Sequence, residues 1–284
     1  MSAPPLFRLV DERRVSVVRD ATPCLQVFDE DPVGSCMVAA RVAEFGVEHG
    51  AIGGELWTRR GVTESLCYAG PNLIPLRGDA EDLKAFSDKA MSTARRCSSV
   101  VGRAELVMPM WRRLESVWGS ARDVREQQPL MALSSMPLCA IDPAVRPVRM
   151  EELDTYLVAA IDMFIGEVGV DPRLGDGGRG YRRRIASLIA AGRAWARFER
   201  GEVVFKAEVG SQSPTVGQIQ GVWVHPEWRG HGLGTSGTAA LASAVVASGR
   251  IASLYVNSYN TVARATYARI GFEQVGTFAT ILLD

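Results

Sequence analysis

The most constraining feature of this sequence is a run of glycines between a predicted strand and a predicted helix. The strand covers residues 216–224 and ends in the apolar run Val222-Trp223-Val224, and residues 235–248 carry small and apolar residues at helical spacing. Arg229-Gly230-His231-Gly232-Leu233-Gly234 lies between them. Glycine lets the backbone approach a ligand closely, and the unpaired N–H groups at a helix start favour anions. This arrangement predicts a pyrophosphate site, to which Arg229 adds a permanent positive charge.

Two general phosphate-binding motifs explain this segment less well. Residues 232–237 formally match the G-x-G-x-x-G pattern of dinucleotide-binding folds. Those folds place an Asp or Glu about 20 residues further on, to hold a ribose. Asn257 stands there instead, and too few residues follow it to complete a doubly wound sheet. A P-loop is excluded because no Gly-Lys-Ser/Thr follows the glycines.

The glycine turn resembles the acyl-CoA site of the GNAT acetyltransferase superfamily. The family pattern Arg/Gln-x-x-Gly-x-Gly/Ala after a strand is met by Arg229, Gly232 and Gly234. A second block follows about 25 residues later, in the family's order: the strand-ending Asn257, then Asn260 at the start of helix 261–270, which carries Tyr267 and stops at Gly271-Phe272. The resemblance covers residues 146–284. It implies an α/β fold with a mixed sheet and helices on both faces.

The resemblance also implies an activity. We expect an N-acetyltransferase that moves an acetyl group from acetyl-CoA, its co-substrate, to a primary amine of a small molecule or protein. Tyr267 is expected to protonate the leaving CoA thiolate, because a phenol with a pKa of about 10 stays protonated at neutral pH. The alternative is a catalytically weak GNAT-like module that binds CoA and regulates a partner. The residues expected to bind the cofactor are Val222, Trp223, Val224, Arg229, Gly230, His231, Gly232, Leu233, Gly234, Thr235, Asn257 and Asn260.

The general base and the acceptor site are expected on neighbouring segments. Relatives often carry the base on the strand before the glycine loop, but Gln218 and Gln220 are neutral amides that cannot take a proton. Glu208, on the preceding strand, is the nearest candidate base by topology, and Glu167 is another. Catalysis through a water chain, or with an amine that is already deprotonated, is the alternative. Glu167 and Asp171, in the glycine-rich segment 164–180, are expected to attract a cationic amine. A flexible, merely soluble connector is the competing interpretation of that segment.

The first half of the sequence repeats the order of elements of the second half. A hairpin at 53–69, helices at 80–95 and 103–118, and strands at 98–101 and 125–133 are predicted. We therefore expect a degenerate GNAT-like domain over residues 1–140 and a GNAT domain over residues 146–284. Where the glycine loop should stand, residues 71–79 hold two prolines and end in Asp79, whose charge repels phosphate. CoA binding is thus expected in the second domain alone.

Composition excludes several other classes. The formal net charge is zero, so the chain has no basic field for nucleic acid or a membrane surface. Five scattered cysteines without a C-x-x-C pair, and three histidines, argue against a disulfide framework and predict no metal site. The start of the chain lacks the apolar core of a leader, and no apolar run approaches 18 residues, which predicts a cytoplasmic protein. Nothing in the pattern indicates an oligomeric state.

Overall fold

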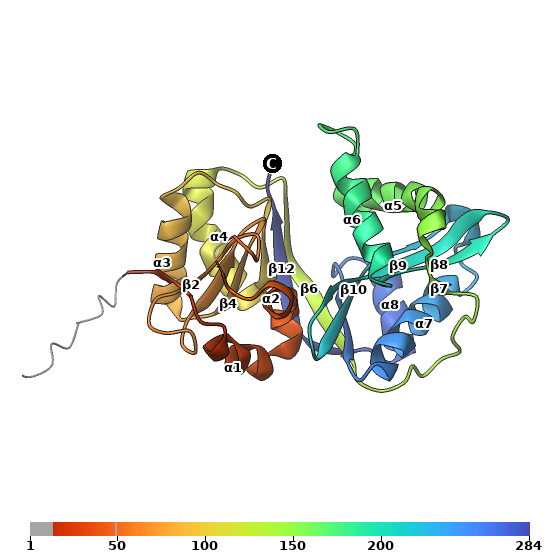
Figure 1. Ribbon diagram of the computed structural model, residues 1–284, viewed down its shortest axis with the longest axis horizontal. Coiled ribbons are helices and arrows are strands. Elements are labelled where there is room, and N and C mark those ends of the chain that lie inside the picture. Colours follow the sequence, from red (N-terminus) through yellow and green to blue (C-terminus); the bar gives the residue numbers. More distant parts are fainter. Residues whose placement is uncertain (1–13, 49) are drawn as a thin grey trace, which may run out of the picture. The chain divides into compact units, whose positions relative to one another are not determined.

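A computed structural model describes residues 14–48 and 50–284, and the chain forms two compact units (Figure 1). Among the described residues, the first unit comprises residues 14–31, 44–48, 50–126 and 279–284, and the second comprises residues 32–43 and 127–278. The predicted absence of a leader concerns the first few residues, which lie outside the described part. Within that part, no helix has the length and apolar character required to cross a bilayer.

The first unit is a sheet with two helices on its apolar face. Antiparallel pairing joins β1 to β2, β2 to β3 and β3 to β4, whereas β4 and β5 are parallel. The buried residues of α3 and α4 form one cluster with Trp57, Cys67 and Leu73 of the strands. The elements are β1 (Ser16–Val17), α1 (Thr22–Glu30), β2 (Glu55–Thr58), β3 (Leu66–Ala69), β4 (Asn72–Arg77), α3 (Ala80–Met91), β5 (Ser99–Arg103) and α4 (Ala104–Trp118).

The second unit is a mixed sheet in which the strand order runs β6-β11-β10-β9-β8-β7. β10 pairs with β11 in parallel, and the other neighbours pair antiparallel. The strands are β6 (Asp123–Leu133), β7 (Arg146–Pro147), β8 (Ala194–Glu199), β9 (Glu202–Gln212), β10 (Val216–Val224), β11 (Ile251–Tyr255) and β12 (Glu273–Leu282).

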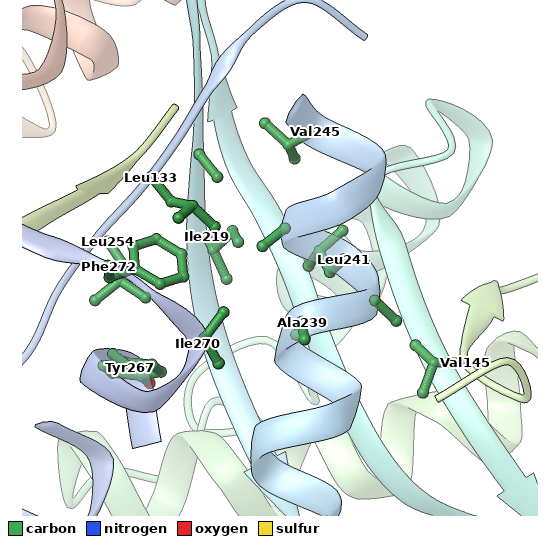
Figure 2. Close-up of a cluster of buried hydrophobic side chains, with 14 of the residues drawn as sticks. Leu133, Val145, Ile219, Ala239, Leu241, Val245, Leu254, Tyr267, Ile270 and Phe272 are labelled. Atoms are coloured by element: carbon green, nitrogen blue, oxygen red, sulfur yellow. The ribbon is translucent and has the colours of Figure 1, made fainter. Parts of the chain in front are cut away.

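Helices cover both faces of this second sheet. Phe205, Ala207 and Val209 of β9 belong to the core cluster with α7, whereas Lys206 and Glu208 of the same strand contact Tyr156 of α5. Figure 2 shows the cluster around Ile219, Leu241 and Val245, beneath α7. The helices are α2 (Pro32–Phe45, of which Pro32–Ala43 belongs to this unit), α5 (Leu153–Val168), α6 (Arg179–Ala190), α7 (Leu233–Ala247) and α8 (Thr261–Ile270), with 3-10 turns η1 (Met150–Glu152) and η2 (Pro226–Trp228).

The two units repeat one succession of elements. The first runs β2-β3-β4-α3-β5-α4 and then into β6, and the second runs β8-β9-β10-α7-β11-α8 and then into β12. In each case the last strand ends in the other unit. The second half of β6 pairs with β11 through Leu130–Leu133, while Ala279–Leu282 of β12 belong to the first unit. The predicted ranges 1–140 and 146–284 therefore describe halves of the sequence, whereas each compact unit borrows segments from the other half.

Most predicted elements lie where the sequence places them, with one correction. Strand 216–224 and helix 261–270 have the predicted bounds, and Arg200-Gly201 forms a hairpin turn, with left-handed φ angles of 52° and 84°. The predicted loop at 71–79 is wrong, because Asn72–Arg77 form a strand. Burial of Leu73 and Ile74 outweighs the proline within the strand. β12 is a single strand from Glu273 to Leu282, since Gly276 does not interrupt it.

Candidate functional site

The glycine turn before α7 presents free backbone N–H groups. Gly230 and Gly232 adopt φ angles of 80° and 81°, a region that residues with a Cβ avoid. Gly232 is the residue that precedes the helix, and no side chain caps it. Within the described residues, the N–H groups of Gly230, His231 and Gly232 donate to no acceptor. These donors and the positive end of the α7 dipole make a site for an anion.

Beside this turn, β10 and β11 part from each other. Their parallel pairing covers only Val216–Gln218 and Ile251–Ser253, although β10 continues to Val224. A register shift between Gln220 and Trp223 marks a bulge, where Gly221 has φ 60°. His225 N donates to Val204 O across the β9 side, so by alternation the backbone of Val224 points toward the open β11 side. The strand therefore offers unpaired backbone groups next to the glycine turn.

The side chains around the turn have different positions. Arg229 is exposed, and its Nε donates to Val224 O at 3.1 Å. The ring of Trp223 stands at 88° to that of His225, with 5.8 Å between centroids. The Leu233 side chain is buried in the core, so only its backbone can reach a ligand. Thr235 N donates to Gly232 O, which closes the first turn of α7.

Tyr267 lies in the same core cluster as Leu233, and Val222 and Val224 pack against that cluster. Its ring contacts Phe272 edge to face, as Figure 2 shows. The residue is 8% exposed, and its hydroxyl makes no hydrogen bond to any group of residues 14–48 or 50–284. Burial raises the pKa of the Tyr267 phenol, with a smaller contribution from the charge of Glu167. The phenol is thus protonated at neutral pH and has a hydrogen available to donate.

The two asparagines predicted in the site have hydrogen-bond partners within the protein. Asn257 Oδ1 accepts from Gln128 Nε2 at 2.8 Å, and its Nδ2 donates to the Tyr259 hydroxyl at 2.8 Å. Asn260 caps α8, accepting from Ala263 N at 3.1 Å. These bonds fix the end of β11 and the start of α8 on one side of the opening. They leave a direct ligand contact of either asparagine as a prediction.

Glu208 belongs to a buried polar cluster on the opposite face of β9 from α7. Its Oε1 accepts from Lys206 Nζ at 2.7 Å and from the Tyr156 hydroxyl at 3.0 Å, and its Oε2 accepts from Gln220 Nε2 at 3.4 Å. Lys206 is 0% exposed and Glu208 is 2% exposed. A Cβ on Gly221 would lie 3.3 Å from Lys206 Nζ, so the ion pair lies directly under the bulge.

The charges in this cluster determine the protonation states of Glu208 and Tyr156. Burial alone raises the pKa of the Glu208 carboxyl, but the adjacent Lys206 ammonium, the Arg184 charge and the Gln220 amide outweigh it, and the pKa is lowered. Burial and the Glu208 charge raise the pKa of Tyr156. Glu208 is therefore a carboxylate at neutral pH and a weak proton acceptor.

The predicted acceptor residues lie around the end of α5. Glu167 is exposed in the last turn of that helix, close enough for its charge to raise the pKa of both Tyr267 and Tyr181. Asp171, in the following loop, forms a bidentate ion pair with Arg173, with oxygen–nitrogen distances of 2.7 and 2.9 Å. Glu167 is thus associated with the site, while the charge of Asp171 is balanced locally.

Sequence reasoning missed Lys206 and Tyr156. The signal for Lys206 was present, since Lys206 and Glu208 stand two apart in the otherwise apolar run 203–209 and so face the same side. Tyr156 comes from α5 and carried no local signal. Gln218 Nε2 and Ser253 Oγ, on the last paired residues of β10 and β11, are buried without a partner in the described part of the chain.

At the corresponding helix start in the first unit, nearby side chains accept hydrogen bonds from the backbone amides. Asp79 Oδ1 accepts from the N–H groups of Glu81 and Asp82, at 3.0 Å each. Asp82 accepts in return from Asp79 N and pairs with Arg59 and Arg60 at 3.1 and 2.6 Å. Two carboxylates thus occupy the amides that an anion would need at the start of α3.

Comparisons with known proteins agree with this architecture. Family models match residues 54–156, described as a domain of unknown function (DUF4081), and residues 206–280, described as FR47-like protein. The fold is that of a Drosophila protein (14% identity, 95% of this chain and 98% of that one, TM-score 0.64) and of a GNAT-family acetyltransferase from Colwellia psychrerythraea (10%, 95% and 100%, 0.57). A tandem GNAT protein from the clavulanic acid biosynthesis pathway also matches (16%, 95% and 98%, 0.50).

The chain has the GNAT fold in a tandem arrangement. The expected α/β fold class and its repetition along the chain are thereby confirmed. Comparison with curated proteins gave no match. Among the described residues of this tandem GNAT fold, no group of three or more His, Cys, Asp or Glu side chains could hold a metal ion.

Removing one partner of the buried ion pair tests whether it supports the bulge. Lys206→Met should lower the free energy of unfolding by about 3 kcal/mol, because it leaves the Glu208 carboxylate buried without its counter-charge. The double variant Lys206→Met/Glu208→Gln should recover much of this loss, since no charge then remains uncompensated. Urea unfolding followed by circular dichroism measures both. Equal losses in the single and double variants would contradict this role of the ion pair.

Proposed function

We propose that the second unit transfers an acetyl group from acetyl-CoA to a primary amine. One observation carries the proposal: the uncapped start of α7 lies next to the point where β10 and β11 part. The free N–H groups of the glycine turn and Arg229 would hold the pyrophosphate of acetyl-CoA. The unpaired backbone at Val222–Val224 would receive the pantetheine arm and face the thioester carbonyl. The GNAT fold of the chain supports this assignment.

The reaction follows from this placement. The amine nitrogen attacks the thioester carbon, the carbon–sulfur bond breaks, and the acetylated amine and CoA are the products. Backbone N–H groups of Val222 and Val224 would stabilise the oxyanion, a contribution of about 3 kcal/mol per donor in comparable sites. Tyr267 would give its proton to the thiolate. Glu208 is the proposed acceptor of the amine proton, and its lowered pKa makes it a weak base for this step.

Acetyl-CoA is expected to bind with one equivalent per chain, at the start of α7. Gly234→Asp should raise the Kd at least about tenfold, because a carboxylate in the first turn opposes the pyrophosphate while it favours the helix itself. Gly234→Ala is the matched control, since a Cβ there meets only Val224 at an ordinary 3.6 Å. Isothermal titration calorimetry reports both the Kd and the stoichiometry. Two equivalents, or an unchanged Kd for Gly234→Asp, would contradict the assignment.

Tyr267→Phe should lower kcat by about 10²-fold and leave the Kd for acetyl-CoA nearly unchanged, because the hydroxyl would act only in the transition state. Release of the CoA thiol over a panel of amines measures the rate. Tyr68→Phe is the control: it removes a buried hydroxyl from the first unit and should leave kcat alone. An unchanged kcat in Tyr267→Phe would reduce Tyr267 to a packing role.

The hydrogen bonds to the Glu208 carboxylate favour one alternative function, a GNAT-like module that binds CoA and regulates a partner. Its two oxygens already accept three hydrogen bonds, and its pKa is lowered, so a strong base is missing from this position. The same thiol assay separates the two functions. A chain that binds acetyl-CoA but releases no thiol with any amine is the regulatory module.

We further propose that the amine acceptor is cationic and approaches past the end of α5. Glu167→Gln should raise the KM for the amine several-fold and leave the KM for acetyl-CoA unchanged, because the Glu167 carboxylate would attract the ammonium. Asp171→Asn should have a smaller effect, since Arg173 already balances that charge. Asp162→Asn, an exposed carboxylate on the same helix, is the control. An anionic preferred acceptor would contradict the role of both Glu167 and Asp171.

A further inference from the structure

The first unit contains a pocket that has no part in the proposed acetyl transfer. It has a volume of about 530 Å³, within the usual range for small-molecule sites. Its walls come from the residues before β2, from the turn between β3 and β4, from the end of α3 with the following segment, and from Trp118 of α4. It adjoins the C-terminal end of α3, whereas the capped amides of this unit lie at the N-terminal end of that helix.

The walls are held in place by hydrogen bonds and close backbone contacts. The hydroxyl of the fully buried Tyr68 donates to Ile52 O at 3.0 Å and anchors the segment before β2. Ser98 N donates to Pro71 O at 2.9 Å and fixes the segment after α3 to the β3–β4 turn. A Cβ on Gly54 would lie 2.4 Å from Ala69 O, so glycine is needed where these two walls meet. The pocket is thus formed without a ligand.

A flat aromatic wall lies beside a cation in this pocket. Lys89 Nζ lies 4.6 Å from the centroid of the Trp57 ring, and Trp57 Nε1 donates to Glu55 Oε2 at 2.8 Å, which fixes the indole. Trp118 adds a second indole to the lining. Trp57 is 7% exposed and Lys89 covers one face of its ring, so Trp57 and Trp118 together line the pocket with a small apolar aromatic surface.

The charge of the lining is positive. Lys89, Arg95 and Arg96 contribute three cations, against the single carboxylate of Glu55. Arg95 donates to the carbonyl of Asp284. Lys89 and Arg96 have no carboxylate within ion-pair distance among the described residues. Burial lowers the pKa of Lys89, so an anion placed beside it would stabilise its charged form.

We propose that this pocket binds a small planar anion, an aromatic or conjugated ring that bears a carboxylate or a phosphate. The ring lies against Trp57 and Trp118, and the anionic group reaches Lys89 and Arg96. The site is separate from the glycine turn of α7, so it gives the tandem chain a second ligand of a different chemical class.

Four probes and the full-length chain test this inference by calorimetry. 2-Naphthoate and 1-naphthyl phosphate carry a flat ring with either anionic group, 2-naphthamide is the neutral counterpart, and inorganic phosphate lacks the ring. At least one of the two ring anions should bind at micromolar to millimolar concentration, and the one that binds more tightly identifies the anionic group. The amide and inorganic phosphate should each bind at least tenfold more weakly. Absence of binding by both ring anions, or equal binding of the amide, would overturn the proposal.

Charge-removing variants locate the site. Lys89→Met and Arg96→Gln should each raise the Kd of the better ring anion about tenfold, and Arg96 is exposed, so its variant does not depend on the core. Lys84→Met is the matched control, an exposed lysine of α3 outside the pocket. Saturating acetyl-CoA should leave the Kd unchanged. The site would be overturned if Lys84→Met raised this Kd as much as the other two variants do. It would also be overturned if Lys89→Met and Arg96→Gln left the Kd unchanged, or if acetyl-CoA competed with the ring anion.

Discussion

The architecture of the second unit depends on where the hydrogen-bond ladder between β10 and β11 stops. Three residue pairs join the strands, and beyond Gln218 and Ser253 the ladder between β10 and β11 does not continue among the described residues. Unpaired backbone is costly when it is buried, so such an opening persists where something else can satisfy it. The bulge at Gly221 turns the strand there, and the buried pair of Lys206 and Glu208 lies beneath it. The opening between the strands, the bulge at Gly221 and the buried ion pair thus form one contiguous feature of the second unit.

The two helix starts that follow equivalent strands differ in whether their backbone amides are free to bind an anion. Before α7, Gly230 and Gly232 leave the amides free, and no side chain folds back onto them. Before α3, Asp79 and Asp82 accept from those amides and hold each other in a capping box, with Arg60 as counter-ion. The amides of the helix start are thus free in one unit and capped in the other, and the backbone differs as well, since Gly232 is left-handed and Asp79 is extended. The helix dipole favours either an anionic ligand or a carboxylate at such a position.

Local patterns in the sequence predicted the fold and the glycine turn, because both depend on neighbours along the chain. The alternation in 216–224, the N-cap at Asn260 and the glycine spacing are short-range signals, and the corresponding elements lie as expected. The strand at Asn72–Arg77 was missed because its prolines argue against a strand locally, whereas tertiary burial decides the outcome. The partners of Glu208 were missed for a similar reason: Tyr156 comes from α5, 52 positions away in the sequence. Long-range contacts of this kind leave no periodic trace in a single sequence.

The exchange of last strands between the two repeats has a consequence for how this chain can be divided. A cut in the segment between β6 and β7 would separate two halves, each of which carries a strand that belongs to the other half's sheet. The first half would keep Gln127–Leu133 without β11 as its neighbour, and the second would keep Ala279–Leu282 without the rest of the first unit. Each fragment would expose an unpaired sheet edge, which invites association. Each repeat therefore needs the other to complete its sheet, and removal of either one would leave the other short of a strand segment.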